Sequence, residues 1–392
     1  MSGQNFGGRY VPECLWTPMQ EVAEAYAEIA EEESRPRQAE WLTRRVGRPT
    51  PLSHLVALSR DGGGAQIWAK REDLCQGGSF CATSVVSQAL LAQRMGRKHL
   101  IGATATGDFG VALGSMGAAL GMKVTVFIRR DDMEAELFNT ARMRQLGVEV
   151  IPVAGAITGR RQAIGEALRQ FSLVSDSAFY ASSSLAAPNP YPRILREALH
   201  VIGSECREQL SREGIEAEYI VAPVGSGSFA AGLFGAFLAD GDASTNSQLV
   251  GVQSGGDGDS ARGAAPLVNG RPGVYLGTRS MVLQDEQGQI ATTPTTASGM
   301  AIPVAGPQHA RWLQQGRAHY VTVSDQEALQ ARRRLTEAEG IFASRESGYA
   351  LAYSLKLAPT LEPDQHIVVG ISGSGIRELG SSLQGAEEGK PL

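Results

Sequence analysis

The chain has 392 residues, of which 42% are hydrophobic, and its formal net charge is −5 with acidic and basic residues interspersed. This length allows two domains with large cores, and the lack of a basic face argues against nucleic acid or a membrane surface as partner. No apolar run reaches the roughly 20 residues that span a bilayer, and the N-terminus has no secretory signal pattern. We therefore expect a cytoplasmic protein that acts on a small molecule.

The four cysteines are too few and too scattered for a disulfide framework. None has a histidine or cysteine partner at metal-ligand spacing, so we expect reduced thiols and no metal site.

Residues 1–45 predict an N-terminal helical extension, with an acidic helix over 21–33. A proline-stiffened turn at 47–52 leads to a short strand over 65–70, a glycine turn at 77–78 and a helix over 82–97. Because backbone N–H groups and the helix dipole converge where such a helix begins, this strand–turn–helix stretch is a candidate catalytic or binding site. The first side chain of that helix is the thiol of Cys81.

From residue 100 the pattern alternates glycine-rich strand ends with helices, with strands expected over 100–103, 123–128 and 148–153. A second series begins near 218, with strands over 219–224, 248–252 and 366–371. Such alternation predicts α/β architecture with parallel sheets covered by helices on both faces. The Gly-, Ser-, Thr- and Pro-rich stretch 254–299 predicts a long excursion between elements.

Two glycine-rich turns follow predicted strands, Gly225-Ser226-Gly227-Ser228 and the turn that begins at Ser372. The first either presents N–H groups to a phosphate or carboxylate or is a closely packed turn. The loop Thr106-Gly107-Asp108-Phe109 poses a similar choice. Its Asp108 is either a helix N-cap or a charge that would repel an anion.

Cys81 also has two interpretations. The helix dipole favours its reactive thiolate, which would suit a nucleophile, whereas most lone cysteines are small residues that fill a gap in the core.

The chain closely resembles the β-subunit of tryptophan synthase, a fold-type-II enzyme that uses pyridoxal phosphate (PLP). The resemblance covers nearly the whole chain and is carried by segments of family-like sequence, namely 47–52, 70–74, 88–96, 188–192, 270–274, 283–290 and 351–359. It implies two three-layer αβα domains with parallel sheets: an N-terminal domain over 46–200, with a mobile subdomain at about 97–185, and a C-terminal domain over 201–392. It also implies a homodimer and an α-subunit-like partner.

The resemblance breaks at positions that carry chemistry in the family. Where the family has a histidine and then the lysine that binds PLP covalently, this chain has Phe80 and Cys81. The family's catalytic glutamate falls at Ala103, and its subdomain-closing arginine and aspartate fall at Ala135 and Ala301. A thiol cannot form an imine, so the resemblance implies no covalent PLP, and we expect no cofactor, with non-covalent PLP as the less favoured alternative.

Other positions of the family's site keep their type. The phosphate-binding loop corresponds to Gly225, Ser226, Gly227 and Ser228, the serine at the pyridine nitrogen to Ser372, and an active-site glutamate to Glu346. We expect a substrate pocket that is more apolar than the family's, because phenylalanines replace polar residues. Its expected lining is Phe80, Thr106, Gly107, Phe109, Ser184 and Phe229.

Three hypotheses follow for function. The first is a PLP-independent enzyme that performs acid–base chemistry on an aromatic or apolar small molecule: a cyclisation, isomerisation, addition or condensation in specialised biosynthesis. Asp108, with a pKa raised by desolvation, and Glu346 would be its catalytic carboxylates, and Cys81 a nucleophile or pocket wall. The second is a catalytically silent relative that binds a ligand or regulates a partner enzyme. The third keeps PLP without a covalent bond and uses an external amine.

Overall fold

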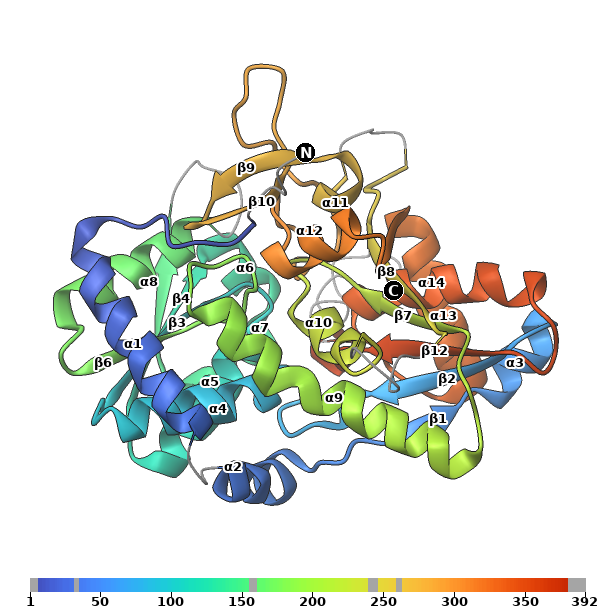
Figure 1. Ribbon diagram of the computed structural model, residues 1–392, viewed down its shortest axis with the longest axis horizontal. Coiled ribbons are helices and arrows are strands. Elements are labelled where there is room, and N and C mark those ends of the chain that lie inside the picture. Colours follow the sequence, from blue (N-terminus) through green and yellow to red (C-terminus); the bar gives the residue numbers. More distant parts are fainter. Residues whose placement is uncertain (1–5, 32–34, 155–160, 239–245, 259–262, 380–392) are drawn as a thin grey trace.

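The computed structural model describes residues 6–31, 35–154, 161–238, 246–258 and 263–379. Its strands form a four-stranded sheet, a six-stranded sheet and a separate two-stranded ribbon, with helices packed around them (Figure 1). The predicted α/β class is therefore confirmed. None of the described helices has both the length and the apolar character needed to cross a membrane.

The four-stranded sheet is parallel throughout and has the order β5-β4-β3-β6. Helices α4, α5, α7 and α8 pack around it. The strands are β3 (His99–Thr104), β4 (Lys123–Arg129), β5 (Glu149–Val153) and β6 (Ala178–Ala181), and the helices are α4 (Cys81–Arg94), α5 (Asp108–Leu120), α7 (Leu137–Gln145) and α8 (Arg161–Val174).

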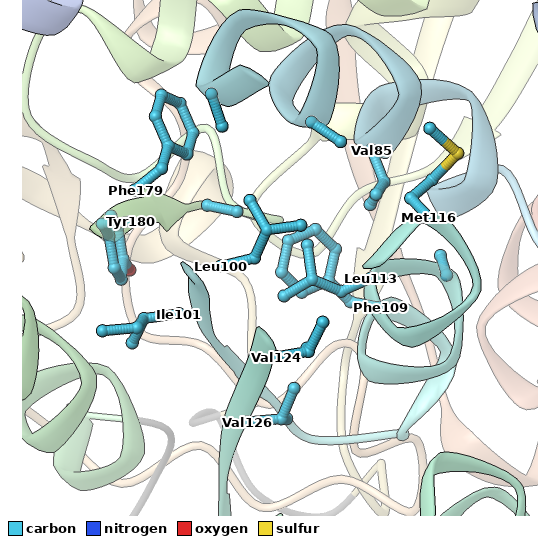
Figure 2. Close-up of a cluster of buried hydrophobic side chains, with 14 of the residues drawn as sticks. Val85, Leu100, Ile101, Phe109, Leu113, Met116, Val124, Val126, Phe179 and Tyr180 are labelled. Carbon is cyan, nitrogen blue, oxygen red and sulfur yellow. The ribbon is translucent and has the colours of Figure 1, made fainter. Parts of the chain in front are cut away.

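Successive side chains of a strand point to opposite sides of the sheet, and helices cover both faces of this one. Figure 2 shows Leu100 on the same side as Phe109 and Leu113 of α5, with Ile101 and Tyr180 apart from them. On that other face the Tyr180 ring lies 6.1 Å from the ring of Phe171, which belongs to α8.

The six-stranded sheet has the order β1-β2-β12-β7-β8-β11. β1 runs antiparallel to β2, and the other pairs are parallel. Along β12, Val368 packs in the cluster that contains α9 and α10, and Val369 in the cluster that contains α14. The strands are β1 (Leu52–His54), β2 (Gln66–Arg71), β7 (Tyr219–Pro223), β8 (Gln248–Ser254), β11 (His319–Val323) and β12 (His366–Ile371).

The helices around this sheet are α3 (Val56–Gly62), α9 (Tyr191–Glu213), α10 (Ser228–Gly235), α13 (Asp325–Glu339) and α14 (Arg345–Leu357). α9 contacts both α10 and α4, so it joins the two sheet units (Figure 1). The remaining elements are α1 (Glu13–Glu31), α2 (Arg35–Trp41), α6 (Arg130–Ala135), α11 (Pro266–Asn269), α12 (Pro307–Gln314), the ribbon β9 (Arg271–Tyr275) and β10 (Thr278–Val282), and the short helical turns η1 (Leu42–Val46), η2 (Glu72–Leu74) and η3 (Ala358–Thr360).

The strands expected from the sequence are present, with β1, β6 and β11 added to their sheets and β9–β10 formed within the excursion at 254–299. One expectation is corrected: the six-stranded sheet is not wholly parallel, because its edge strand β1 runs antiparallel to β2. The domain boundaries at 46–200 and 201–392 stay a prediction, and residues 380–392 lie outside the described residues. The topology departs from a simple split at residue 200, since β1 and β2 pair into the sheet that contains β7, β8 and β12.

Candidate functional site

A cleft of about 890 Å³, counting its open mouth, lies where the parallel strands of both sheets end. Its walls come from the segments that follow β2, β3, β6, β7 and β12, and from the start of α14. The carboxyl ends of parallel strands are the usual place for a binding site in α/β proteins, because the loops that follow them converge there.

The strand–turn–helix stretch after β2 reaches the cleft with Ser79, Phe80 and Cys81, and α4 begins at Cys81 as expected. Its position is fixed by backbone hydrogen bonds to the end of β12: the Phe80 N–H donates to the Ser372 carbonyl at 3.1 Å. The Ser374 N–H donates to the Gly78 carbonyl at 2.8 Å.

Lys70, at the end of β2, points away from the cleft into a buried ion network. Its Nζ lies 3.0 Å from Glu205, which also accepts from Arg48 at 2.7 Å, and Arg48 in turn bonds Glu72 at 2.7 Å. Burial alone would raise the pKa of Glu72, but Arg48 and Lys70 lower it, so this carboxylate stays charged. The network anchors the turn that carries Cys81. No described lysine lines the cleft, and Lys390 falls outside the described residues.

The loop between β7 and α10 presents backbone N–H groups to the cleft. The backbone N–H groups of this loop, residues 225–228, donate to no group in the described part of the chain. N–H groups at the start of a helix commonly lack a partner within the helix, and they can bind an anion. Gly227 has φ +93°, and a Cβ there would lie 2.1 Å from His309 Nε2, so only glycine allows this close approach.

His309 supports the loop from behind. Its Nε2 lies 2.8 Å from the Gly227 carbonyl and its Nδ1 lies 2.8 Å from the Tyr320 hydroxyl. Burial lowers the pKa of His309 to about 4, so the imidazole is neutral at physiological pH and donates from Nε2 to the carbonyl. The loop is therefore held by a neutral group.

Two carboxylates, Asp108 and Glu346, line the cleft and share one buried arginine, Arg377. The arginine lies 3.3 Å from Asp108, 3.0 Å from Glu346 and 2.9 Å from a third carboxylate, Glu136. We call Asp108, Glu136, Glu346 and Arg377 the Arg377 cluster. Its members come from α5, the junction of α6 and α7, α14 and the segment after β12, so it bridges the two sheet units.

The three carboxylates of the Arg377 cluster differ in proton affinity. Burial raises the pKa of Asp108, in the direction expected from the sequence, although Arg377 and a 2.8 Å hydrogen bond from Asn139 oppose the shift. Burial likewise raises the pKa of Glu136 to about 7. Burial would also raise the pKa of Glu346, but Arg377 and the Gly299 N–H outweigh it and lower that pKa. Glu346 is therefore the charged carboxylate at the cleft, whereas Asp108 holds a proton more readily.

Hydroxyl groups line the floor of the cleft near β12. Ser372 Oγ lies 3.2 Å from Ser347 Oγ, which lies 3.0 Å from Ser344 Oγ. On another wall, the Ser184 hydroxyl accepts from the Ala186 N–H at 3.1 Å. A hydroxyl such as Ser372 can donate to or accept from a ligand ring nitrogen without imposing a charge.

The aromatic residues occupy two environments. The Phe80 and Phe229 rings lie 5.5 Å apart between centroids and form one wall of the cleft. Phe109 also borders the cleft, but it is 2% exposed, and its ring packs against Leu100 and Leu113 in the core of the four-stranded sheet (Figure 2).

The structure brings almost all of the predicted site residues to this cleft; of them only Gly107 lies outside its lining. Those at the cleft are Phe80, Cys81, Thr106, Asp108, Phe109, Ser184, Gly225, Ser226, Gly227, Ser228, Phe229, Glu346 and Ser372. Their roles stay predictions. The sequence reasoning missed Arg377 and Glu136. The sequence did hold a signal for Arg377: it follows the glycine turn after the last strand, and segments that follow parallel strands meet at the same edge of the sheet.

The cysteines form no disulfide, and no group of three or more His, Cys, Asp or Glu in the described part of the chain has metal-binding geometry.

Comparisons with known proteins place the whole chain among PLP enzymes. Residues 43–373 match the pyridoxal-phosphate dependent enzyme family. The chain is 38% identical over 388 residues to the tryptophan synthase beta chain of Polaromonas naphthalenivorans, which covers 97% of this chain and 88% of that protein. It is 40% identical over 379 residues to that of Stenotrophomonas maltophilia, which covers 95% of this chain and 92% of that protein.

A solved structure has the same fold at low identity. It is a crystal structure of a lysine-to-alanine mutant of O-ureido-L-serine synthase with O-ureido-L-serine bound, with a TM-score of 0.66 and 18% identity over 87% of this chain and 92% of that one.

These findings correct three expectations. The PLP-independent enzyme, the catalytically silent relative and the absence of a cofactor are wrong, because the family match spans the site and the relatives at 38–40% identity are tryptophan synthase beta chains. The physical reason is that the changed side chains, Cys81 among them, leave in place the backbone N–H groups of the loop 225–228 and the hydroxyls of Ser372 and Ser347. The chain belongs to the pyridoxal-phosphate dependent enzymes of fold type II.

Proposed function

We propose that this chain is a PLP-dependent enzyme that acts on an amine-bearing small molecule and holds the cofactor by non-covalent contacts in the cleft. When bound, PLP supplies an electron sink for negative charge on the carbon next to an amine nitrogen. The observation that carries the proposal is the loop Gly225–Ser228, whose N–H groups have no partner in the described chain and face a cleft that a PLP family match includes.

The residues present fit the polar ends of the cofactor. The N–H groups of the loop and the positive end of α10 suit a phosphate. Ser226 and Ser228 add hydroxyls whose oxygens lie 3.4 Å apart. At the floor, Ser372 offers a hydroxyl to a ring nitrogen.

The residues do not provide an amine for the aldehyde end. Cys81, which stands where the family resemblance places a lysine, is 7% exposed and lines the cleft, and the described lysines lie elsewhere. The amine must therefore come from the substrate.

The two carboxylates of the cleft, Asp108 and Glu346, are the groups to which we assign proton transfer and substrate orientation. Asp108 lines the cleft, and burial raises its pKa, so it holds a proton more readily than an ordinary aspartate, and we assign it the role of acid and base. Glu346, which stays charged, orients Arg377 and can accept a hydrogen bond from a substrate. The Phe80–Phe229 wall suits an apolar or aromatic portion of the substrate.

The relatives' name adds a proposal about assembly. A "beta chain" is one component of an enzyme with more than one kind of chain, so we propose that this chain also assembles with a second chain. The homodimer and the cytoplasmic location stay predictions.

Cofactor binding tests the proposal directly. Protein dialysed free of cofactor and mixed with PLP should retain absorbance between about 330 and 420 nm after gel filtration and should melt at a higher temperature. In Ser226→Asp the new carboxylate would repel the phosphate, so both signals should weaken, whereas Ser204→Asp on the exposed face of α9 should behave as wild type. A wild-type protein that neither retains PLP nor gains stability with it would overturn the proposal, and melting of each variant without PLP reports whether it folds.

The attachment chemistry gives a second test. Borohydride treatment of the PLP complex should leave no cofactor on the peptide that contains Cys81, because reduction fixes an imine and a thiol forms none. Cys81→Lys should convert the site, so that the same peptide carries the cofactor mass. A stoichiometric adduct on a lysine of the wild-type protein would contradict non-covalent binding.

A further inference from the structure

The cleft has an electrostatic polarity along its length. At one end, the N-terminus of α10 offers N–H groups that have no partner among the described residues and that favour an anion. At the other end lie Asp108 and Glu346. No lysine, arginine or histidine side chain is among the described residues that line the space between them.

The two ends border the same small space. Gly299 joins them: its N–H donates to Glu346 Oε1 at 3.0 Å, and its carbonyl oxygen lies 2.6 Å from the position that a Cβ on Gly225 would take. A ligand with an anionic group on the loop therefore lies near Glu346 as well.

At the carboxylate end, buried negative groups outnumber buried positive ones among the described residues. Arg377 pairs with Asp108, Glu136 and Glu346, whose side chains, like its own, are 5–14% exposed, and it also lies 3.4 Å from Glu378. Three other arginines lie near the Arg377 cluster, but their hydrogen bonds and ion pairs are to residues outside it. Arg142 reaches Asp108 only through Asn139, and Arg332 and Arg345 pair with Glu378. Buried carboxylates in excess are relieved by a proton or by a cation.

The thiol of Cys81 adds a chemical argument. The thiol can add to an aldehyde but forms no imine, so the described side chains of the cleft offer PLP no Schiff base, whereas a ligand that carries its own ammonium group can bond directly to Glu346 or Asp108.

We propose that this cleft binds the amine form of the cofactor, pyridoxamine 5′-phosphate, in preference to the aldehyde form, PLP, with Glu346 and Asp108 as the partners of the ammonium group. This inference rests on the proposed function, since it assumes that the cleft is a site for this class of cofactor. It goes further by naming the chemical form that the chain selects and the residues that select it.

Competing affinities test the inference without reference to turnover. Isothermal titration of the dialysed protein with pyridoxamine 5′-phosphate, PLP and pyridoxine 5′-phosphate compares an ammonium, an aldehyde and a neutral alcohol on the same phosphorylated ring. A charge-assisted hydrogen bond predicts that the amine form binds about tenfold or more tightly than the alcohol and the aldehyde. In Glu346→Gln and Asp108→Asn this preference should fall towards unity while the alcohol keeps its affinity.

A matched control is Glu337→Gln on the exposed face of α13, where the carboxylate pairs with Arg333; it should keep the full preference. Equal or tighter binding of PLP in the wild-type protein would overturn the inference and leave the proposed function intact. Failure of all three compounds to bind would instead overturn the proposed function. A preference that survives both cleft variants would contradict the assignment of Glu346 and Asp108.

Discussion

Two buried ion networks in the described part of the chain differ in charge balance. In the first, two cations, Arg48 and Lys70, meet two carboxylates, Glu72 and Glu205, away from the cleft. In the Arg377 cluster, one cation meets three carboxylates, two of which line the cleft; Arg377 also lies 3.4 Å from Glu378, which pairs with Arg332 and Arg345, so carboxylates are still in excess by one. A balanced network is complete without a ligand and supports the fold, whereas an unbalanced one at a cleft retains capacity for a proton or a cationic group.

Breaking the balanced network should have the largest effect on stability. Arg48→Met leaves Glu72 and Glu205 buried without their main partner, and such a change costs about 3–5 kcal/mol. The free energy of unfolding, from urea titration at pH 7.5, measures it. A loss no larger than that of an exposed substitution would show that this network is not structural.

Breaking the unbalanced network should cost less and should depend on pH. In Arg377→Met the three carboxylates lose their cation, but they can take up protons, so we expect a loss of about 1–3 kcal/mol at pH 8 that shrinks at pH 6. Unfolding titrations at both values test this. A loss that is equal at pH 6 and pH 8 would contradict the idea that protons replace the arginine.

The smallest expected effect is a gain in the free energy of unfolding, in the variant Glu136→Gln. The pKa of Glu136 is raised to about 7 in the fold, above its ordinary value of 4.5. Its stabilising contribution is therefore complete below pH 4.5 and is lost as the pH rises through 7. Glu136→Gln, which keeps a hydrogen-bond acceptor for Arg377, should be about 1–2 kcal/mol more stable than wild type at pH 8 relative to pH 5.

The control for this last comparison is Glu337→Gln, which lies on the surface and should show no pH-dependent difference from wild type between pH 5 and pH 8. If Glu136→Gln follows the same flat profile, the carboxylate is charged at all these pH values and the cluster is balanced by other groups.

Much of the cleft could be predicted from the sequence because its parts are local. Gly225–Ser228 and the stretch from Lys70 to Cys81 are each a strand, a glycine turn and a helix start, and adjacent residues decide that geometry. The family resemblance then brought Ser372 and Glu346 to the same site. The error about the cofactor arose from giving the changed side chains, Cys81 above all, more weight than the backbone N–H groups of Gly225–Ser228, which are suited to an anion.

The sequence by itself determined the alternation of the main strands and helices and the glycine turns, because short-range periodicity and turn chemistry encode them, and its resemblance to known sequences gave the family. The tertiary structure alone decided the charge environment of the site. Arg377 and Glu136 are 241 residues apart in the chain, yet their side chains lie 2.9 Å apart. No local pattern records such a meeting, since burial and pairing, which set the proton affinity of a carboxylate, exist only after the chain has folded.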